Sequence, residues 1–419
     1  MKIVRFDFQT AGKLAKYTDG GQQKILVRKL FDMKRNVTEA TTAYDYVGGQ
    51  TVIDEILDMF EVAVIHDTTG EIQYYIDRND ITKQKNGTDA NVNGADGSVF
   101  IIKPEFWVKE YDIGTVRHYS FSKTYIAGYR KSPRFAIGKY KAHRPTTGDH
   151  TGKIVSWSGK EITTQVSASF GNRTEFRTAA RLGRNNKWNM IPYHIHRDMT
   201  LLARAKYKTT DFQTALGHVS NAGSAEWNTF NGRNPVWETG HMNDQGPLFS
   251  GNKPITISDW PEAGPGELET EVVSFMGIED WFGHIWEWLD GIDTNYPSEG
   301  DPLTYITEDY TKFTDASGGE TPPDGYNLVG AVPTTSAYVR EMHEGEIIPK
   351  YAGGGDPVAS GSRYYCDYHK ISSSAGWRAA RVGGGLLSDA GSGPFYMRFN
   401  YTASVGLSLL GGRLGLYLD

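Results

Sequence analysis

The stretch Gly277-Ile278-Glu279-Asp280-Trp281-Phe282-Gly283-His284-Ile285-Trp286-Glu287-Trp288-Leu289-Asp290-Gly291 is the most informative part of this sequence for the fold. Trp286 and Trp288 are two positions apart, so in extended backbone both rings lie on the same face. Two such rings bury a large apolar area, which predicts core positions for Trp281, Trp286 and Trp288. Glu287 then points to the opposite side, where we expect it to accept hydrogen bonds from backbone N–H groups of a loop.

The chain around this stretch is rich in glycine and aromatic residues. Its 419 residues include 48 Gly, 24 Tyr and 10 Trp, while hydrophobic residues make up 38%. Glycine permits tight turns and large rings bury much area each, so this composition is typical of a loop-rich protein with short strands. The chain is too long for one ordinary domain, and we expect two.

Charge and cysteine content exclude several classes of protein. The net charge is −6, which leaves no basic excess to neutralise phosphates, so we expect no nucleic-acid partner. Cys366 is the single cysteine, which excludes an intrachain disulfide and is more typical of a small core residue than of a reactive thiol. Residues 1–8 alternate as a strand does and resemble no signal peptide, and no apolar run is long enough to span a membrane. We therefore expect a protein made in a cytoplasm without a cleaved signal and without membrane insertion.

Periodicity predicts short elements of both kinds. Residues 194–208 lack Gly and Pro and repeat apolar side chains at helical spacing, which predicts the best helix of the chain, with one apolar face. A shorter helix is predicted to end near Phe60. Strands are predicted for 62–65 and 72–76 as a hairpin, and also for 99–102, 106–108, two segments of 119–140, 271–275 and 411–419.

The pattern of the sequence changes after Trp107, and this change suggests a domain boundary. Residues 1–112 are predicted to form a small N-terminal mixed α/β module that serves assembly or attachment. Residues 113–419 are predicted to form an irregular α+β domain that binds a ligand, with few helices and short, twisted antiparallel strands.

Four stretches, in the same order along the chain, resemble one family. Residues 96–107 resemble the Gly-x-Val-hydrophobic-x-x-Pro-x-Phe-aromatic segment of phage and prophage C-type-lectin-like proteins, and 201–217 resembles the helix and Gln-x-x-Ile-Gly turn that follow there. The stretch 277–291 is similar to the Gly-Asn-Val-Trp-Glu-Trp core of formylglycine-generating-enzyme-like domains. Residues 376–385 and 411–414 resemble the Trp-Arg, Gly-Gly and Gly-x-Arg-Leu framework of those domains, which also predicts a core position for Trp377.

Over residues 96–418 the chain thus resembles phage C-type-lectin-like proteins of the formylglycine-generating-enzyme-like fold, akin to the variable proteins of diversity-generating retroelements. The resemblance implies a tail or head fibre adhesin in the virion, made in the host bacterial cytoplasm. The implied partners are a host-cell surface receptor, either protein or glycan, and other virion proteins. A homo-oligomer is expected, with a trimer as the preferred state. A purely structural virion component is the alternative within the same family.

Catalysis is not expected. Formylglycine-generating enzymes use a pair of C-terminal cysteines, and Cys366 has no second cysteine. His194 and His196 are badly spaced for joint metal ligation on a helix, and residues 290–295 are interpreted as a solvated turn rather than a calcium loop. We therefore expect no cofactor and no metal. With 50 acidic residues, a carboxylate pair for glycoside hydrolysis stays open as a less favoured alternative, a polysaccharide depolymerase.

The segment 386–410 departs most from the family pattern. The departure falls where that family carries codons rewritten by a retroelement. Either such rewriting or ordinary drift explains the difference. Glycines frame this segment, and Tyr, Ser, Asn and Leu within it have the composition of a binding surface. Leu386 and Leu387 are predicted to be an exposed apolar pair that marks an interface. The predicted ligand-binding patch comprises Tyr364, Tyr365, Tyr368, His369, Leu386, Leu387, Ser388, Asp389, Tyr396, Arg398, Asn400 and Tyr401.

Overall fold

The computed structural model describes residues 30–164, 171–217, 237–257, 268–319, 321–353 and 364–418. It also describes the backbone of β1 (Val4–Arg5), β2 (Leu14–Asp19) and β3 (Gln22–Val27), which form a three-stranded antiparallel sheet. Strands dominate and helices are few, so the α+β class expected from the predicted elements is confirmed, with β-structure prevailing. No helix in these ranges is long and apolar enough to cross a membrane.

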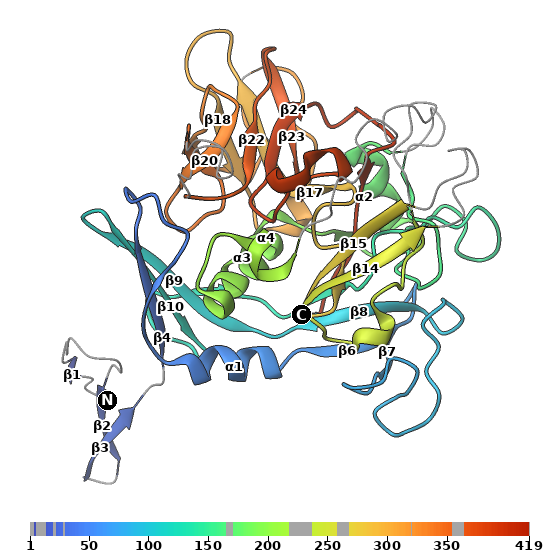
Figure 1. Ribbon diagram of the computed structural model, residues 1–419, viewed down its shortest axis with the longest axis horizontal. Coiled ribbons are helices and arrows are strands. Elements are labelled where there is room, and N and C mark those ends of the chain that lie inside the picture. The colour runs from blue at the N-terminus through green and yellow to red at the C-terminus, as the bar shows by residue number, and fades with distance from the viewer. Residues whose placement is uncertain are drawn as a thin grey trace.

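A six-stranded antiparallel sheet runs along the base of the molecule in Figure 1. Its order is β13-β26-β12-β8-β6-β7, so the last strand of the chain lies between strands from the first half. Strand β8 is buried at every position, which explains its continuous apolar sequence. The predicted hairpin and the helix ending near Phe60 are confirmed. The elements are α1 (Gln50–Asp58), β6 (Glu61–Ile65), β7 (Ile72–Tyr75), β8 (Ser98–Lys103), β12 (Phe135–Gly138), β13 (Trp188–Met190) and β26 (Leu414–Tyr417).

A second sheet corrects the expected domain boundary. Its order is β11-β9-β10-β4-β5, with β4 (Phe31–Asn36), β5 (Asp45–Gly48), β9 (Phe106–Ile113), β10 (Val116–Ser122) and β11 (Arg130–Ser132). The boundary expected between residues 112 and 113 falls inside β9, and β10 pairs with both β9 and β4. The change of pattern marks a tight turn at Gly114, where φ is +61°, and not a linker. In the described chain, segments on both sides of residue 113 share two sheets.

The upper half of the molecule is built on a nine-stranded sheet (Figure 1). Its path is β19-β18-β17-β23-β24-β22-β20-β21, and β25 pairs with β17. All its pairings are antiparallel except β17 with β25 and β22 with β24. The strands are β17 (Trp286–Tyr296), β18 (Leu303–Ile306), β19 (Asn327–Ala331), β20 (Ala337–Met342), β21 (Pro349–Ala352), β22 (Tyr368–Lys370), β23 (Gly376–Val382), β24 (Met397–Tyr401) and β25 (Leu410–Gly411).

Smaller elements complete the fold. A three-stranded sheet contains β14 (Gly251–Ile257), β15 (Leu268–Phe275) and β16 (Ile278–Glu279). The short helical segments are α4 (Phe212–Leu216), η1 (Asn243–Gln245), η2 (Tyr310–Lys312) and η3 (Leu386–Gly391).

Helix α2 (Arg173–Arg181) was not predicted, although its start carries a signal. The side chain of Asn172 accepts from the backbone N–H of Glu175, and the Glu175 carboxylate accepts from the Asn172 N–H, a reciprocal cap.

Helix α3 (Tyr193–Tyr207) lies at the centre of the molecule between the sheets (Figure 1). Its position in the sequence matches the prediction, but the single apolar face does not, because every residue from Tyr193 to Ala205 is buried. Buried polar side chains need partners within the protein, and other elements supply them for two charged residues of the helix. Arg197 pairs with Glu346 at 2.9 Å, and Asp198 accepts from Arg130 at 2.8 Å.

One buried arginine joins the base sheet to the upper sheet. Arg413, directly before β26, donates to the carbonyl oxygens of Gly138 and Lys139 at 3.0 Å each and of Glu279 at 2.7 Å. Its Nη2 also lies 2.7 Å from Oε1 of Glu287, which receives Lys141 Nζ at 2.6 Å. Glu287 therefore accepts from two charged side chains and not from a loop backbone, which corrects the prediction.

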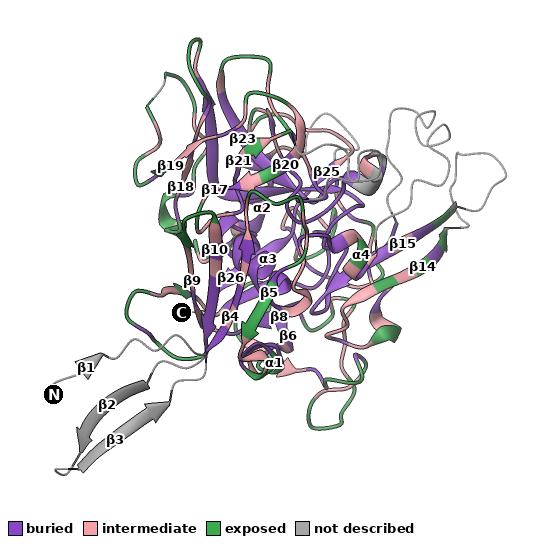
Figure 2. Cartoon of the chain, turned by 60° about the vertical axis from the view of Figure 1, so that its left-hand side comes forward, coloured by how far each residue is buried: buried purple, intermediate pink, exposed green. Residues whose placement is uncertain are grey.

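The four tryptophans predicted for the core are buried. Trp281, Trp286, Trp288 and Trp377 are between 0% and 6% exposed. Figure 2 shows β17, which contains two of them, coloured as buried. Trp286 and Trp288 join the same apolar cluster on one face of β17, as their spacing requires. The indole N–H of Trp288 donates to the Gly171 carbonyl at 3.1 Å, which satisfies its polar atom.

The first prediction concerns the buried charges at Glu287. Glu287→Gln keeps the shape of the side chain but leaves the Arg413 and Lys141 charges without their carboxylate. We expect the free energy of unfolding at pH 7 to fall by about 3–5 kcal/mol, the usual cost of breaking a buried ion pair. Denaturant unfolding measures this loss. As a control, Glu61→Gln breaks only the Glu61–Lys85 pair at the surface and should cost less than about 1 kcal/mol. Equal losses in both variants would contradict the assigned role.

The same carboxylate gives a pH dependence. Burial opposes ionisation of Glu287, but Arg413 and Lys141 outweigh burial and lower its pKa to about 2. A depressed folded-state pKa stabilises the fold above the ordinary value of 4.5, and this stabilisation is lost as pH falls from 4.5 towards 2. The stability difference between the wild type and Glu287→Gln should therefore shrink over that window. A difference that stays constant down to pH 2.5 would show that the carboxylate is not held ionised.

A further prediction tests the tryptophan core. Trp288→Ala should lower the free energy of unfolding by about 3–5 kcal/mol, because it empties a fully buried site and removes the bond to Gly171. Trp107→Ala is the matched control, since Trp107 lies half-exposed on β9 and should cost clearly less. Thermal unfolding of both variants compares the two sites, and a larger loss for Trp107→Ala would overturn the assignment.

Candidate binding surface

Part of the predicted patch forms one face of β24. Tyr396, Arg398 and Asn400 alternate with Met397 and Phe399, whose side chains enter the main core. Arg398 and Asn400 are half-exposed, and so is Tyr401 at the end of the strand. The structure therefore brings the second half of the predicted patch together at β24, with Arg398, Asn400 and Tyr401 half-exposed and Tyr396 buried.

Trp286 is the floor of this face. Its ring contacts Tyr396 edge-on with centroids 4.6 Å apart. The Arg398 guanidinium lies 4.5 Å from the Trp286 ring centroid, and that of Arg381, on β23, lies 4.9 Å from it. Cations over an aromatic face are attracted to its negative quadrupole, so the buried indole holds both arginines in place.

Arg381 and Arg398 are direct cross-strand partners of β23 and β24. Arg381 is 1% exposed, donates from Nη2 to the Asn400 side-chain oxygen at 3.1 Å and lies 4.2 Å from the Tyr401 ring centroid. Burial, and next to it the charge of Arg398, lower the pKa of Arg381 to about 9. No carboxylate of the described residues forms an ion pair with either arginine. Within the described part of the chain, the two like charges thus face one another without a carboxylate partner.

Tyr368 extends the same face onto β22. It is half-buried, its hydroxyl donates to the Ser336 carbonyl at 3.1 Å, and its ring meets Tyr396 and Tyr338 edge-on. A side chain added at Gly391, the last residue of η3, would lie 3.6 Å from Tyr368 Cβ, so this turn passes close to the base of the Tyr368 side chain. Tyr368 is consequently fixed by its neighbours, with only part of its ring at the surface.

Four predicted contact residues are buried, so the single exposed patch of the prediction is wrong for them. Tyr365 packs against Phe395 in the main core, and His369 is fully enclosed, with Nδ1 3.2 Å from the Met397 carbonyl oxygen. Burial lowers the pKa of His369 to about 4, so its ring is neutral at pH 7. Tyr396 is 3% exposed, and Leu386 is 1% exposed and belongs to the core. These side chains supply the apolar support of the sheet, and Leu386 does not mark an interface.

The remaining predicted residues lie elsewhere or outside the description. The carbonyl oxygen of Tyr364 accepts from Arg35 at 3.0 Å and from Thr210 at 2.6 Å, which ties this residue to the opposite side of the core. Ser388 caps its own turn, because its hydroxyl accepts from the Gly385 N–H. The side chains of Leu387 and Asp389 lie outside the described residues.

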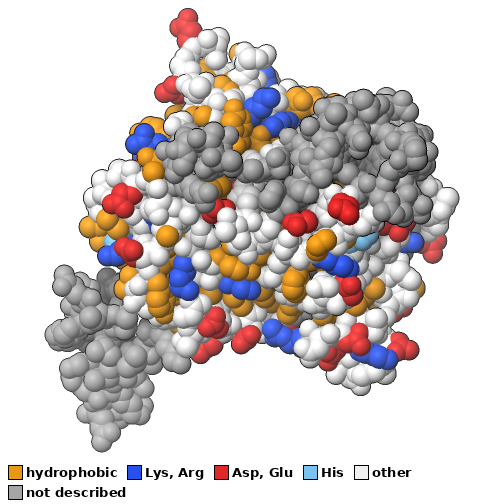
Figure 3. All heavy atoms as spheres, in the orientation of Figure 1, with side chains coloured by type: hydrophobic (Ala, Val, Ile, Leu, Met, Phe, Trp, Pro, Cys, Tyr) orange, Lys and Arg blue, Asp and Glu red, His pale blue; other side chains and the backbone are white. Residues whose placement is uncertain are grey.

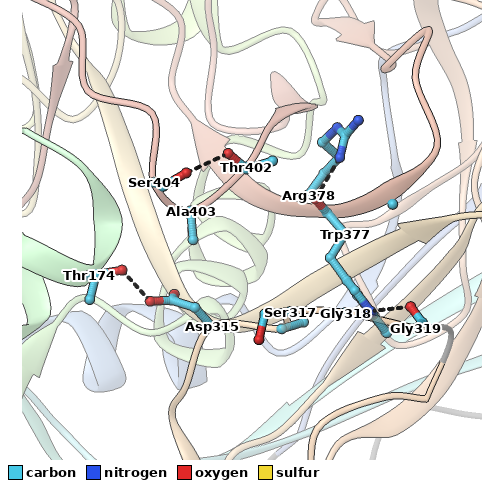
Figure 4. A pocket seen from close by; sticks show the side chains of 12 residues that line it. Thr174, Asp315, Ser317, Gly318, Gly319, Trp377, Arg378, Thr402, Ala403 and Ser404 are labelled. Carbon is cyan, nitrogen blue, oxygen red and sulfur yellow. Dashed lines mark hydrogen bonds between the residues drawn. The ribbon is translucent and has the colours of Figure 1, made fainter.

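A hollow of about 430 Å³ adjoins the far end of β23. Figure 4 shows its walls, which come from Thr174 on α2, residues 315–319, Trp377 and Arg378 on β23, and residues 402–404 after β24. Trp377 is fixed there by an indole N–H bond to the Gly319 carbonyl at 3.1 Å, and the Thr402 and Ser404 hydroxyls lie 2.9 Å apart. The sequence reading missed this hollow because its walls come from four separate segments.

Asp315 carries the charge of this hollow, and its role is structural. Its carboxylate receives Arg173 Nε at 2.7 Å and Arg177 Nη2 at 2.8 Å. Although burial opposes ionisation, these two guanidinium groups hold the pKa of Asp315 well below its ordinary range. A carboxylate held ionised in this way cannot donate a proton at neutral pH, so it does not fit the acid of a hydrolase.

The candidates for metal binding and catalysis also have structural partners. No group of three potential metal ligands occurs among the residues that the structure describes. Residues 290–295 form part of the buried strand β17 and not a solvated turn, because Arg177 pairs with Asp290 and Arg173 with Asp293. His196 Nε2 lies 2.8 Å from the Pro394 carbonyl oxygen, and Cys366 is buried, as expected for a core residue.

Arg381 is the main residue of the surface that the sequence reading missed. It was seen only as part of the Trp-Arg framework around 376–385. Arg381 is the register partner of Trp288 on β17. Its side chain therefore lies on the same face of the sheet as Trp286 and Trp288. Figure 3 shows basic side chains set among hydrophobic ones on the upper part of the molecule. Pairing β23 with β24 was the missing information, since only the register places Arg381 beside Arg398.

Comparison with known proteins does not assign a family. No protein-family model matches the sequence, and no curated protein matches it significantly. The function must therefore be inferred from the surface itself and from the sequence resemblance.

Proposed function

We propose that this chain is a receptor-binding protein of a phage particle, with a C-type-lectin-like fold of the formylglycine-generating-enzyme kind. The observation that carries the proposal is the surface at β24, where Arg398, Asn400 and Tyr401 are half-exposed and Arg398 lies over the buried Trp286 ring. Tyr, Asn and Arg are the residue types that binding surfaces use most, because rings give contact area and polar groups give directed hydrogen bonds.

The frame below this face suits a binding role. Trp286 is held within the sheet by Tyr396, and Glu287, its neighbour, is held by Arg413 and Lys141. A binding residue on a fixed strand loses little conformational freedom when a ligand binds, so more of the contact energy appears as affinity. The loop that follows, with Thr402 and Ser404 exposed, adds polar groups at the rim.

In this proposal the receptor is a protein or glycan of the host-cell surface, and the chain lies in a tail or head fibre of the virion. Other virion proteins contact it, and copies of the chain assemble into a homo-oligomer, with a trimer preferred. Several copies on one particle multiply a weak single-site affinity. Whether a retroelement diversifies residues 386–410 is decided by sequencing independent isolates, in which substitutions should concentrate at half-exposed positions of this segment.

The test is binding of purified, fluorescently labelled protein to cells of the bacterium whose genome or phage carries the gene. The double variant Asn400→Ala and Tyr401→Ala removes two half-exposed side chains and should lower cell binding at least about tenfold, the loss for truncating contacts worth above about 1 kcal/mol. Tyr351→Ala is the control, because Tyr351 is 53% exposed on β21 of the same sheet. Thermal unfolding checks that both variants fold.

Two outcomes contradict the proposal. If the wild-type protein binds no host cells although it assembles into particles, the chain is a structural virion component. If the double variant folds and binds cells as well as Tyr351→Ala does, the receptor contact lies elsewhere on the molecule.

A further inference from the structure

Three cations lie side by side across three adjacent strands. Lys370 on β22 is the register partner of Arg398 on β24, which is in turn the register partner of Arg381 on β23. Register partners point to the same face of a sheet, and neighbouring strands are roughly 4.8 Å apart. The three positive side chains therefore form a row about 10 Å long, on the face that contains Tyr368 and Tyr396.

This row lacks the carboxylate partners that several buried arginines of the described protein have, although buried Arg204 and Arg35 also lie over aromatic rings without an ion pair among the described residues. Arg173, Arg177, Arg197 and Arg413 each pair with carboxylates. By contrast, no carboxylate in the described chain forms an ion pair with any member of the row. Like charges placed directly opposite destabilise a sheet. Stacking on Trp286 offsets this cost for Arg381 and Arg398, and Lys370 has no such contact among the described residues.

The other polar groups of the row are donors. The side-chain oxygen of Asn400 is taken by Arg381, which leaves its half-exposed NH₂ group to donate outward. Arg398 donates through Nε to the Tyr396 hydroxyl at 3.0 Å and is half-exposed, and Lys370 is exposed. A surface that combines guanidinium, ammonium and amide donors is complementary to an anion.

From these observations we propose that the row Lys370–Arg398–Arg381 recognises an anionic group of the ligand, a carboxylate, phosphate or sulfate carried by a cell-surface saccharide. The inference rests on the proposed receptor-binding function. Arg398 and Lys370 contact the anion directly, the amide of Asn400 adds a donor, and the half-exposed ring of Tyr401 packs against the sugar. Arg381 is buried, so it acts without contacting the anion. It adds positive potential and fixes the orientation of Asn400.

The experiment measures binding of small probes to the full-length protein by titration calorimetry and by ligand-observed NMR. The probes are methyl glucuronide, the neutral methyl glucoside, glucose 6-phosphate and inorganic sulfate. We expect glucuronide and glucose 6-phosphate to bind, sulfate to compete with both, and methyl glucoside to bind at least tenfold more weakly. Binding should weaken further as salt rises, because charge attraction at a surface is screened.

The variants separate this site from general electrostatic attraction. Lys370→Gln and Arg398→Gln should each reduce affinity for glucuronide by about tenfold or more, since each removes a charge-assisted hydrogen bond. Arg398→Lys should restore part of that loss. Lys34→Gln removes the same charge from β4, in another sheet, and should leave binding unchanged. Lys370 is exposed, so its substitution keeps the test independent of folding.

Several results would overturn the inference. It falls if methyl glucoside binds as well as glucuronide, or if the Lys370 and Arg398 variants bind anions like the wild type. It also falls if host cells bind the wild type and Lys370→Gln equally, and free glucuronide does not compete. A protein that binds no host cells but still binds glucuronide through this row contradicts the proposed function and leaves the anion site standing.

Discussion

The buried contact between Arg413 and Glu287 is the interaction on which the rest of the structure depends. It links the strand that closes the base sheet to the first residues of the upper sheet, and it also holds the carbonyl oxygens of Gly138, Lys139 and Glu279. A buried charge is costly unless it is fully paired, so this arginine can lie in one place only. The neighbouring glycine permits the approach, because a Cβ at Gly412 would lie 3.1 Å from the Phe176 ring.

Buried side-chain ion pairs recur through the interior, and they explain the modest apolar content of the chain. Helix α3 is enclosed on all sides, and Arg197 and Asp198 within it are satisfied by ion pairs from other elements. Helix α2 binds the upper sheet in the same way, through Arg173 with Asp293 and Arg177 with Asp290. Such contacts need fixed geometry, so they favour a single arrangement of the sheets over many similar ones.

Against this background the uncompensated cations of the upper sheet stand out. Several buried arginines pair with carboxylates, whereas Arg204 lies over the rings of Tyr119 and Phe395. On β23 and β24, Arg381 and Arg398 likewise stack on Trp286. Trp286 consequently has two roles, as part of the apolar core below and as the support of a charged surface above. The half-exposed Arg398 beside buried Arg381 is the feature on which the proposed binding role of this face rests.

The sequence alone determined the local features. Two-residue spacing placed Trp286 and Trp288 on one face, and helical periodicity located α3, because both depend only on backbone geometry. It did not determine which way the C-terminal residues face. Tyr365, His369 and Leu386 were expected at the surface and are buried, and Arg381 was not expected to reach Arg398. Those outcomes follow from the pairing of β22, β23 and β24, strands whose register is set by contacts with segments distant in the sequence. Composition can show that a segment suits a surface, but only tertiary packing decides which of its alternating side chains meets water.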